Sequence, residues 1–275
     1  GKIIPELSNF LKNNFGSISI KHNFEGFYPR FLVGTKQNSF PSVSFTHSYY
    51  DCSSCTTETD FWNRTIDTHY DSSVYIPIFT KNNEYTNLII YPNFSPSNFS
   101  VSLQLFDKSG NKVQELPKFL DVKSNESKLH KIDFNKIIES FDQYHEITSA
   151  YVVSHFATEK IPARIKFGLD VGISDSQSKL PCNICFNSKM GNPLIENKPG
   201  SFHWAPLLPN RNSIITLGNF STLKNYDRSA KIEMTFYRKE DLSTISKTFT
   251  LGPNCETRIS SVDDDIKNFL KSEGW

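Results

Sequence analysis

The sequence lacks an excess of charge of either sign, and it lacks long hydrophobic runs. Thirty Lys and Arg residues oppose 29 Asp and Glu residues over 275 residues, which leaves a net charge of +1. A protein that binds nucleic acid through its phosphates needs a strongly basic surface, so we expect no nucleic-acid partner. The longest apolar stretches, such as 88–91 and 151–153, are far shorter than the roughly 20 residues of a membrane helix, so no membrane span is expected.

The sequence also lacks the short motifs of several enzyme classes. It contains no G-x-S-x-G elbow, no phosphate-binding glycine loop, no G-x-G-x-x-G after a strand and no H-E-x-x-H. We therefore favour a non-catalytic protein. Paired carboxylates for glycoside hydrolysis depend on a spatial separation that no motif encodes, and Asp51 and Asp71 are the nearest candidates for such a pair.

Short runs of β-branched or aromatic residues, separated by turn residues, are present along most of the chain. Few helical patterns interrupt them, and strands do not alternate with helices. This pattern is typical of antiparallel sandwiches and jelly rolls. The runs lie at 31–33, 42–46, 74–79, 88–91, 101–106, 151–156, 163–169, 214–217, 230–237 and 247–251.

An internal repeat with a period near 130 residues orders these runs. The segment 88–95 resembles 214–221, and both end in Asn-Phe-Ser. The segment 101–106 resembles 232–237, while the C-x-x-C pairs and the prolines at 77 and 206 recur at similar offsets. Short amphipathic helices are expected at 133–138 and 265–270, with a related segment at 9–12.

The repeat predicts a mainly β fold of two tandem antiparallel β-sandwich units, jelly-roll-like, each with one short helix. We expect an N-terminal helix and lead-in over 1–27, one sandwich over 28–149 and a second over 150–275. The chain starts at Gly1 without a signal-like segment, and tandem β modules commonly belong to a longer chain or assembly, which we expect here.

The cysteines form two C-x-x-C pairs and one single residue. Cys52 with Cys55 and Cys182 with Cys185 have a spacing that suits tetrahedral zinc, so a structural zinc shared by the two units is one interpretation. Two local disulfides, or four reduced thiols in apolar surroundings, are the alternatives. Cys255 has no counterpart in the first unit and carries no hypothesis.

The stretch 46–71 differs most between the two expected units, because its counterpart is mainly Asn, Lys, Gly and Pro. Aromatic rings together with Asp, Arg and His suit a carbohydrate or a protein partner, since rings stack while polar groups fix hydroxyls. The alternative is that the aromatic residues only close the end of a sandwich. The candidate ligand-binding residues are Tyr50, Asp51, Trp62, Arg64, His69 and Asp71, with His203 from the second unit.

The histidines of this region support a second hypothesis. His47, His69 and His203, with Asp51 or Asp71, could surround a catalytic metal in an enzyme of jelly-roll type. Such sites usually carry a tight His-x-His or His-x-Asp pair, and 69–71 is the single His-x-Asp here. The favoured function is therefore a binding or structural β-sandwich module, and a metal-dependent enzyme is the alternative.

Overall fold

The protein is mainly β, as the sequence predicts. The computed structural model describes residues 32–37, 39–47, 61–63, 67–91, 98–123, 126, 128–141, 146–157, 160–162, 165–176, 180–187, 189–190, 205–208, 212–271 and 274. Two short helices occur in these residues, α2 (Phe134–Glu139) and α4 (Asp264–Leu270). The strands are β1 (Leu32–Lys36), β2 (Val43–His47), β3 (Phe61–Asn63), β4 (Ser72–Pro77), β5 (Glu84–Ile90), β6 (Phe99–Phe106), β7 (Lys112–Val122), β8 (His130–Asp133), β9 (Ser149–Phe156), β10 (Lys160–Pro162), β11 (Lys166–Ile173), β12 (Cys182–Asn187), β13 (Lys189–Met190), β14 (Ile214–Gly218), β15 (Ala230–Tyr237), β16 (Thr244–Leu251) and β17 (Glu256–Ser260).

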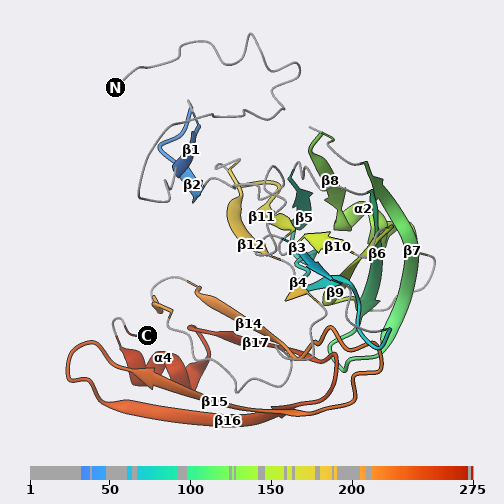
Figure 1. Ribbon diagram of the computed structural model, residues 1–275. Coiled ribbons are helices and arrows are strands. Elements are labelled where there is room, and N and C mark those ends of the chain that lie inside the picture. Colours follow the sequence, from blue (N-terminus) through green and yellow to red (C-terminus); the bar gives the residue numbers. More distant parts are fainter. Residues whose placement is uncertain are drawn as a thin grey trace, which may run out of the picture.

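Two antiparallel sheets form a sandwich that occupies the right-hand part of Figure 1. One sheet has four strands in the order β12-β11-β5-β8, and the other has five in the order β13-β4-β9-β6-β7. The smaller pairs β1-β2 and β3-β10 lie outside these two sheets. Antiparallel sheets of this kind stack when each strand directs its apolar residues to one face.

The core lies between the two sheets and follows the period of two that strands impose. In β6, the fully buried Val101, Leu103 and Leu105 belong to this core. β9 places Val152 opposite Leu103 and Ala150 opposite Leu105, and both are fully buried as well. Because a slip of one residue would move every such side chain to the other face, this alternation fixes the register.

Helix α2 closes one end of the core. Asp133 caps its N-terminus, and Phe134 at its first position is fully buried. Asn135 ties the helix to β5, because its side-chain oxygen accepts from the Thr86 backbone N–H (3.2 Å) and its amide donates to the Glu84 carbonyl (2.9 Å). The helix expected at 133–138 is thereby confirmed.

Residues 205–208 and 212–271 fold into a smaller β structure, which lies below the sandwich in Figure 1. β14 pairs with β17 and β15 pairs with β16, both antiparallel. Helix α4 packs on this structure through the buried Ile266 and Leu270, which share a second core with Leu207 and Phe236. The helix expected at 265–270 is therefore present.

The expected tandem jelly-roll repeat is not confirmed. Strands beyond residue 150 complete the first sandwich: β9 pairs with β4 and β6, β11 pairs with β5, and β13 pairs with β4. β9 is buried on nearly every position, which marks a central strand and requires partners on both edges. Strand pairing therefore crosses the position where we expected one unit to end and the next to begin.

The smaller structure is joined to the sandwich by a junction built on Phe220. The Phe220 ring stacks on Tyr75 (4.9 Å between centroids) and on Tyr151 (5.2 Å), both on the outer face of the five-stranded sheet. The Tyr151 hydroxyl donates to the Ser221 carbonyl (2.5 Å). Near the turn after β6, the Cys255 thiol donates to a backbone carbonyl at 3.1 Å. Part of one face of the five-stranded sheet is thus covered by the C-terminal residues.

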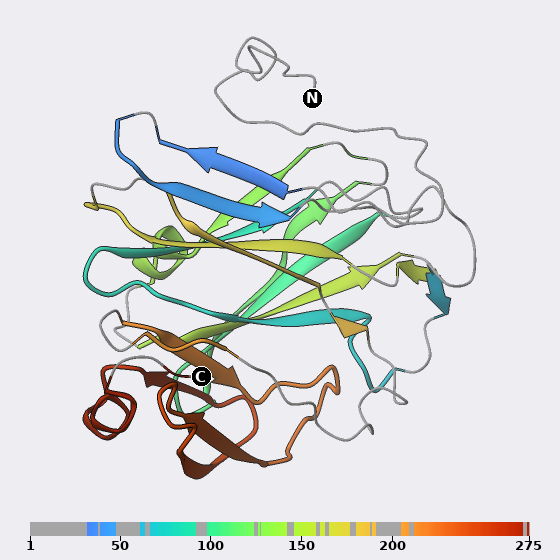
Figure 2. The ribbon, with the colours of Figure 1, turned by 90° about the vertical axis from the view of Figure 1, so that its left-hand side faces the viewer.

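The β1-β2 hairpin lies against β12, as Figure 2 shows. The Ser44 hydroxyl donates to the Pro181 carbonyl there (2.9 Å). The expected helix at 9–12 lies outside the described residues. In the part of the chain that the structure describes, neither helix is long and apolar enough to cross a bilayer.

Candidate functional site

The outer face of the four-stranded sheet carries a row of polar side chains. In this row, Asp170 of β11 stands between Asn183 of β12 and Asn87 of β5, and Asn87 in turn stands beside Asp133 of β8. Residues opposite each other on neighbouring strands share a face. Leu169, the neighbour of Asp170 along β11, is buried in the core, so the polar row faces away from the core.

Two tyrosines lie over β11 on either side of Asp170. Tyr85 stands opposite Gly172, and a Cβ on Gly172 would come within 2.5 Å of the Tyr85 hydroxyl oxygen. A Cβ on Gly168 would come within 2.9 Å of the Tyr91 ring. Glycine in a strand often marks such a close approach. The two glycines are four residues apart, which at about 3.3 Å per residue separates the two ring positions by roughly 13 Å.

We call Tyr85, Tyr91, Asp170 and Asn183 the tyrosine face. All four side chains are partly exposed, so solvent reaches them. The Asn183 amide donates to the Asp170 carboxylate, while the Asn183 side-chain oxygen is buried without a hydrogen-bond partner among the described residues. A buried acceptor of this kind costs about 1–3 kcal/mol of folding free energy.

The electrostatics of the tyrosine face centre on Asp170. Burial raises the pKa of the Asp170 carboxyl, against the lowering effects of the Asn183 hydrogen bond and the charge of Lys131. Burial, and then the negative charge of Asp170, raise the pKa of the Tyr85 hydroxyl. Tyr85 therefore keeps its proton near neutral pH and can donate it in a hydrogen bond.

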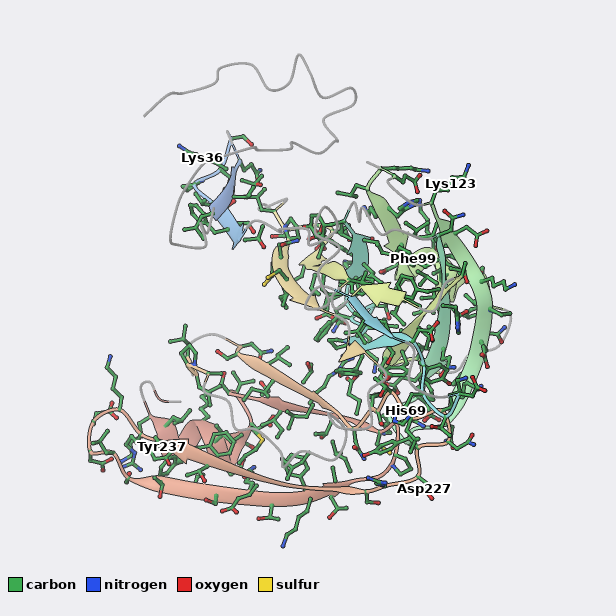
Figure 3. All side chains as sticks on the ribbon, viewed as in Figure 1. Lys36, His69, Phe99, Lys123, Asp227 and Tyr237 are labelled. Atoms are coloured by element: carbon green, nitrogen blue, oxygen red, sulfur yellow. The ribbon has the colours of Figure 1, made fainter. Side chains whose placement is uncertain are left out.

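The residues predicted from the 46–71 stretch do not form the tyrosine face. His69 lies at the junction, where it bridges Leu223 of the C-terminal structure, and Figure 3 shows it at that place. Its Nδ1 lies 3.0 Å from the Thr68 hydroxyl. Asp71 accepts from the Phe156 backbone N–H (2.9 Å) at the end of β9. The structure thus gives both residues contacts that hold elements of the fold together.

The structure describes only some of the other candidate residues of the binding and metal hypotheses. Trp62 lies on β3, whose backbone pairs with β10. His47 ends β2, opposite Leu32. The remaining candidates lie outside the described residues; they are Tyr50, Asp51, Arg64 and His203. Their role as ligand-binding residues stays a prediction.

The described C-x-x-C pair lies on a strand. Cys182 and Cys185 both lie on β12, and residues three apart on a strand point to opposite faces. The strand therefore does not aim both sulfurs at one ion. Cys52 and Cys55 lie outside the described residues, so the shared zinc stays a prediction. Among the residues that the structure places, no three His, Cys, Asp or Glu side chains gather as metal ligands would.

Compared with protein-family models, with curated proteins and with solved structures, the chain gives no match. The fold and the tyrosine face describe a mainly β protein with aromatic and polar side chains on the outer face of one sheet.

The sequence contains a pattern that relates to the tyrosine face, although the repeat pointed to the stretch 46–71 instead. Gly168, Asp170 and Gly172 alternate in the sequence, as do Tyr85 and Tyr91, although the predicted runs at 163–169 and 88–91 include only Gly168 and Tyr91 of these residues. Alternation predicts that such residues share a face. The local sequence does not show that β5 and β11 are neighbours. The tyrosine rings could therefore not be placed over the glycines from the sequence.

Proposed function

We propose that the protein is a non-catalytic carbohydrate-binding β-sandwich module and that the tyrosine face is its binding surface. The observation that carries this proposal is the position of Asp170 and Asn183 between two tyrosine rings on one sheet face. A ring that lies over a strand directs its opposite face away from the sheet.

The chemistry of the tyrosine face matches that of a sugar. A sugar ring has an apolar face of C–H groups, which packs on an aromatic ring, and a rim of hydroxyls, which need donors and acceptors. The partly exposed Asp170 carboxylate can accept hydrogen bonds from sugar hydroxyls, and the Tyr85 hydroxyl can donate one.

The spacing of the rings favours a chain of sugars over a single one. The roughly 13 Å between the two ring positions exceeds what one sugar ring could contact at both ends. Because both ring positions lie along β11, a polymer that follows this strand can contact both rings. We therefore expect a neutral oligosaccharide or polysaccharide as the ligand.

Affinity gel electrophoresis tests this proposal. The wild-type chain is run through native gels that contain a mixed-linkage β-glucan, a galactomannan, a xylan or an α-glucan. We expect retardation by at least one of them, and an affinity at least about tenfold weaker, or roughly 1.4 kcal/mol, in Tyr85→Ala and in Tyr91→Ala. No retardation of the wild type by any polysaccharide would overturn the proposal.

Phe119→Ala supplies the matched control. Phe119 is an exposed aromatic residue on β7, in the other sheet, so its loss removes a ring of similar size from a different surface. This variant should be retarded like the wild type. Equal losses in Phe119→Ala and Tyr91→Ala would show that retardation does not depend on the tyrosine face.

A further inference from the structure

The C-terminal structure repeats the order and pairing of part of the sandwich. In the sandwich, β5 is followed by the β6-β7 hairpin, by β8, which pairs with β5, and by α2. In the C-terminal structure, β14 is followed by the β15-β16 hairpin, by β17, which pairs with β14, and by α4. β15 therefore occupies the position of β6.

Backbone hydrogen bonds support this correspondence. In the sandwich, the Ile78 N–H donates to the Thr148 carbonyl (2.8 Å), and the Thr148 N–H donates to the carbonyl at the end of β6 (3.0 Å). In the C-terminal structure, the Leu207 N–H donates to the Gly274 carbonyl (2.7 Å), and Gly274 bridges Arg238, just beyond β15.

The two corresponding strands differ in what lies along their second edge. β6 lies between β7 and β9, and Val101 and Leu103 are fully buried. Among the described residues, β15 pairs with β16 alone, and the corresponding Ile232 and Met234 are only half-buried. An edge with unpaired N–H and C=O groups and a half-open apolar face is a template for another strand.

We propose that the free edge of β15 pairs with β15 of a second copy of this chain, so that the two hairpins form one four-stranded antiparallel sheet. A two-fold axis relates two identical edges, as in most homodimers. In Figure 3, Asp227 and Tyr237 lie near opposite ends of this strand, and the edge runs between them.

Charge favours one register of this pairing over the two adjacent ones. Lys231 and Glu233 are exposed on the outward face of β15, and Ile232 lies between them on the apolar face. When the two-fold axis passes through Ile232, Lys231 of each copy stands opposite Glu233 of the other. Axes through Lys231 or Glu233 would set like charges opposite each other, which is destabilising.

The apolar face also matches in this register. Ile232 meets its own copy, and Ala230 meets Met234 of the second copy, so the half-buried side chains of one hairpin continue those of the other. Gly274 occupies this edge only at Arg238, beyond the paired stretch.

Sedimentation velocity over a range of protein concentrations tests the proposal with four chains. We expect the wild type to associate reversibly to twice the monomer mass. Glu233→Lys sets two like-charge pairs into the interface and should weaken association about tenfold or more. Adding Lys231→Glu to Glu233→Lys restores opposite charges and should restore association.

Glu240→Lys is the control, because it changes the charge equally within the β15-β16 turn and leaves the edge unaltered. It should associate like the wild type. Circular dichroism melting of all four chains separates a loss of association from a loss of folding. A wild type that stays monomeric at every concentration, or a Glu233→Lys chain that associates as the wild type does, would overturn the proposal.

Discussion

Arg258 is the residue whose removal should most weaken the attachment of the C-terminal structure. Its guanidinium donates to the carbonyls of Ile78 (2.6 Å) and Thr148 (2.9 Å) in the sandwich, and to the carboxylate of Glu256 beside it. It also lies over the Phe79 ring, 4.3 Å from the centroid. One side chain of the C-terminal structure thus bonds to two segments of the sandwich.

The size of the expected loss in unfolding free energy follows from Glu256, whose carboxyl group would remain buried without its cation. The Glu256 side chain is only 2% exposed, and burial raises the pKa of its carboxyl against the opposing effects of Arg258 and Tyr75. Arg258→Met keeps a long apolar side chain over Phe79 but removes the charge. Removing one partner of a buried pair costs about 3–5 kcal/mol, because the other charge stays buried.

Urea unfolding at pH 7, followed by circular dichroism, measures this cost. Arg258→Met should lower the free energy of unfolding by about 3–5 kcal/mol, and Glu256→Gln by less, because the amide still accepts from the Tyr75 hydroxyl. The double variant should lose less than the sum of the single losses, since no charge is left unpaired. A loss below about 1 kcal/mol in Arg258→Met, or strictly additive losses, would refute the reasoning.

Three further predictions concern single residues. Because burial raises the folded-state pKa of the Asp170 carboxyl, ionisation of Asp170 reduces wild-type stability as pH rises through that pKa. Asp170→Asn should therefore melt at a higher temperature than the wild type at pH 7, and this difference should disappear below the unfolded-state pKa. The same variant should lose polysaccharide retardation. Gly172→Ala places a Cβ within 2.5 Å of the Tyr85 hydroxyl, so the partly exposed Tyr85 ring must move; we expect weaker retardation with little loss in urea unfolding, and unchanged retardation would contradict the role of Tyr85. Asn219→Ala removes an amide that donates to three backbone carbonyls at 2.8–3.1 Å, which should cost about 2–4 kcal/mol, and a cost under about 1 kcal/mol would show that these bonds contribute little.

Local patterns predicted the strands better than their partners. The alternating run at 101–106 and the apolar run at 151–156 are β6 and β9, as expected. Their pairing was not predictable, because β9 is adjacent in space to strands that precede it by about fifty residues or more, and neighbours of this kind depend on the whole core. The repeat indicated a second sandwich, while the structure uses the later strands to finish the first.

The candidate site shows the same limit. Gly168 and Gly172 are recognisable in the sequence as same-face glycines of one strand, and Tyr85 as a residue of another. Placing the ring over the glycine needs the β5-β11 register, which connects residues about 87 positions apart in the printed sequence. By contrast, His69 and Asp71 were predicted as site residues from their residue types. In the structure, both make contacts that hold the fold together.

The Cys255 thiol at the junction gives the protein an internal reporter of its own opening. Burial raises the pKa of this thiol, and its hydrogen bond to the turn after β6 forms only when the two parts of the chain are in contact. A thiol reacts as its thiolate, so alkylation should become faster once the junction opens. Peptide mapping separates this cysteine from the exposed Cys182. The alkylation rate would then measure how often the C-terminal structure leaves the sandwich under native conditions.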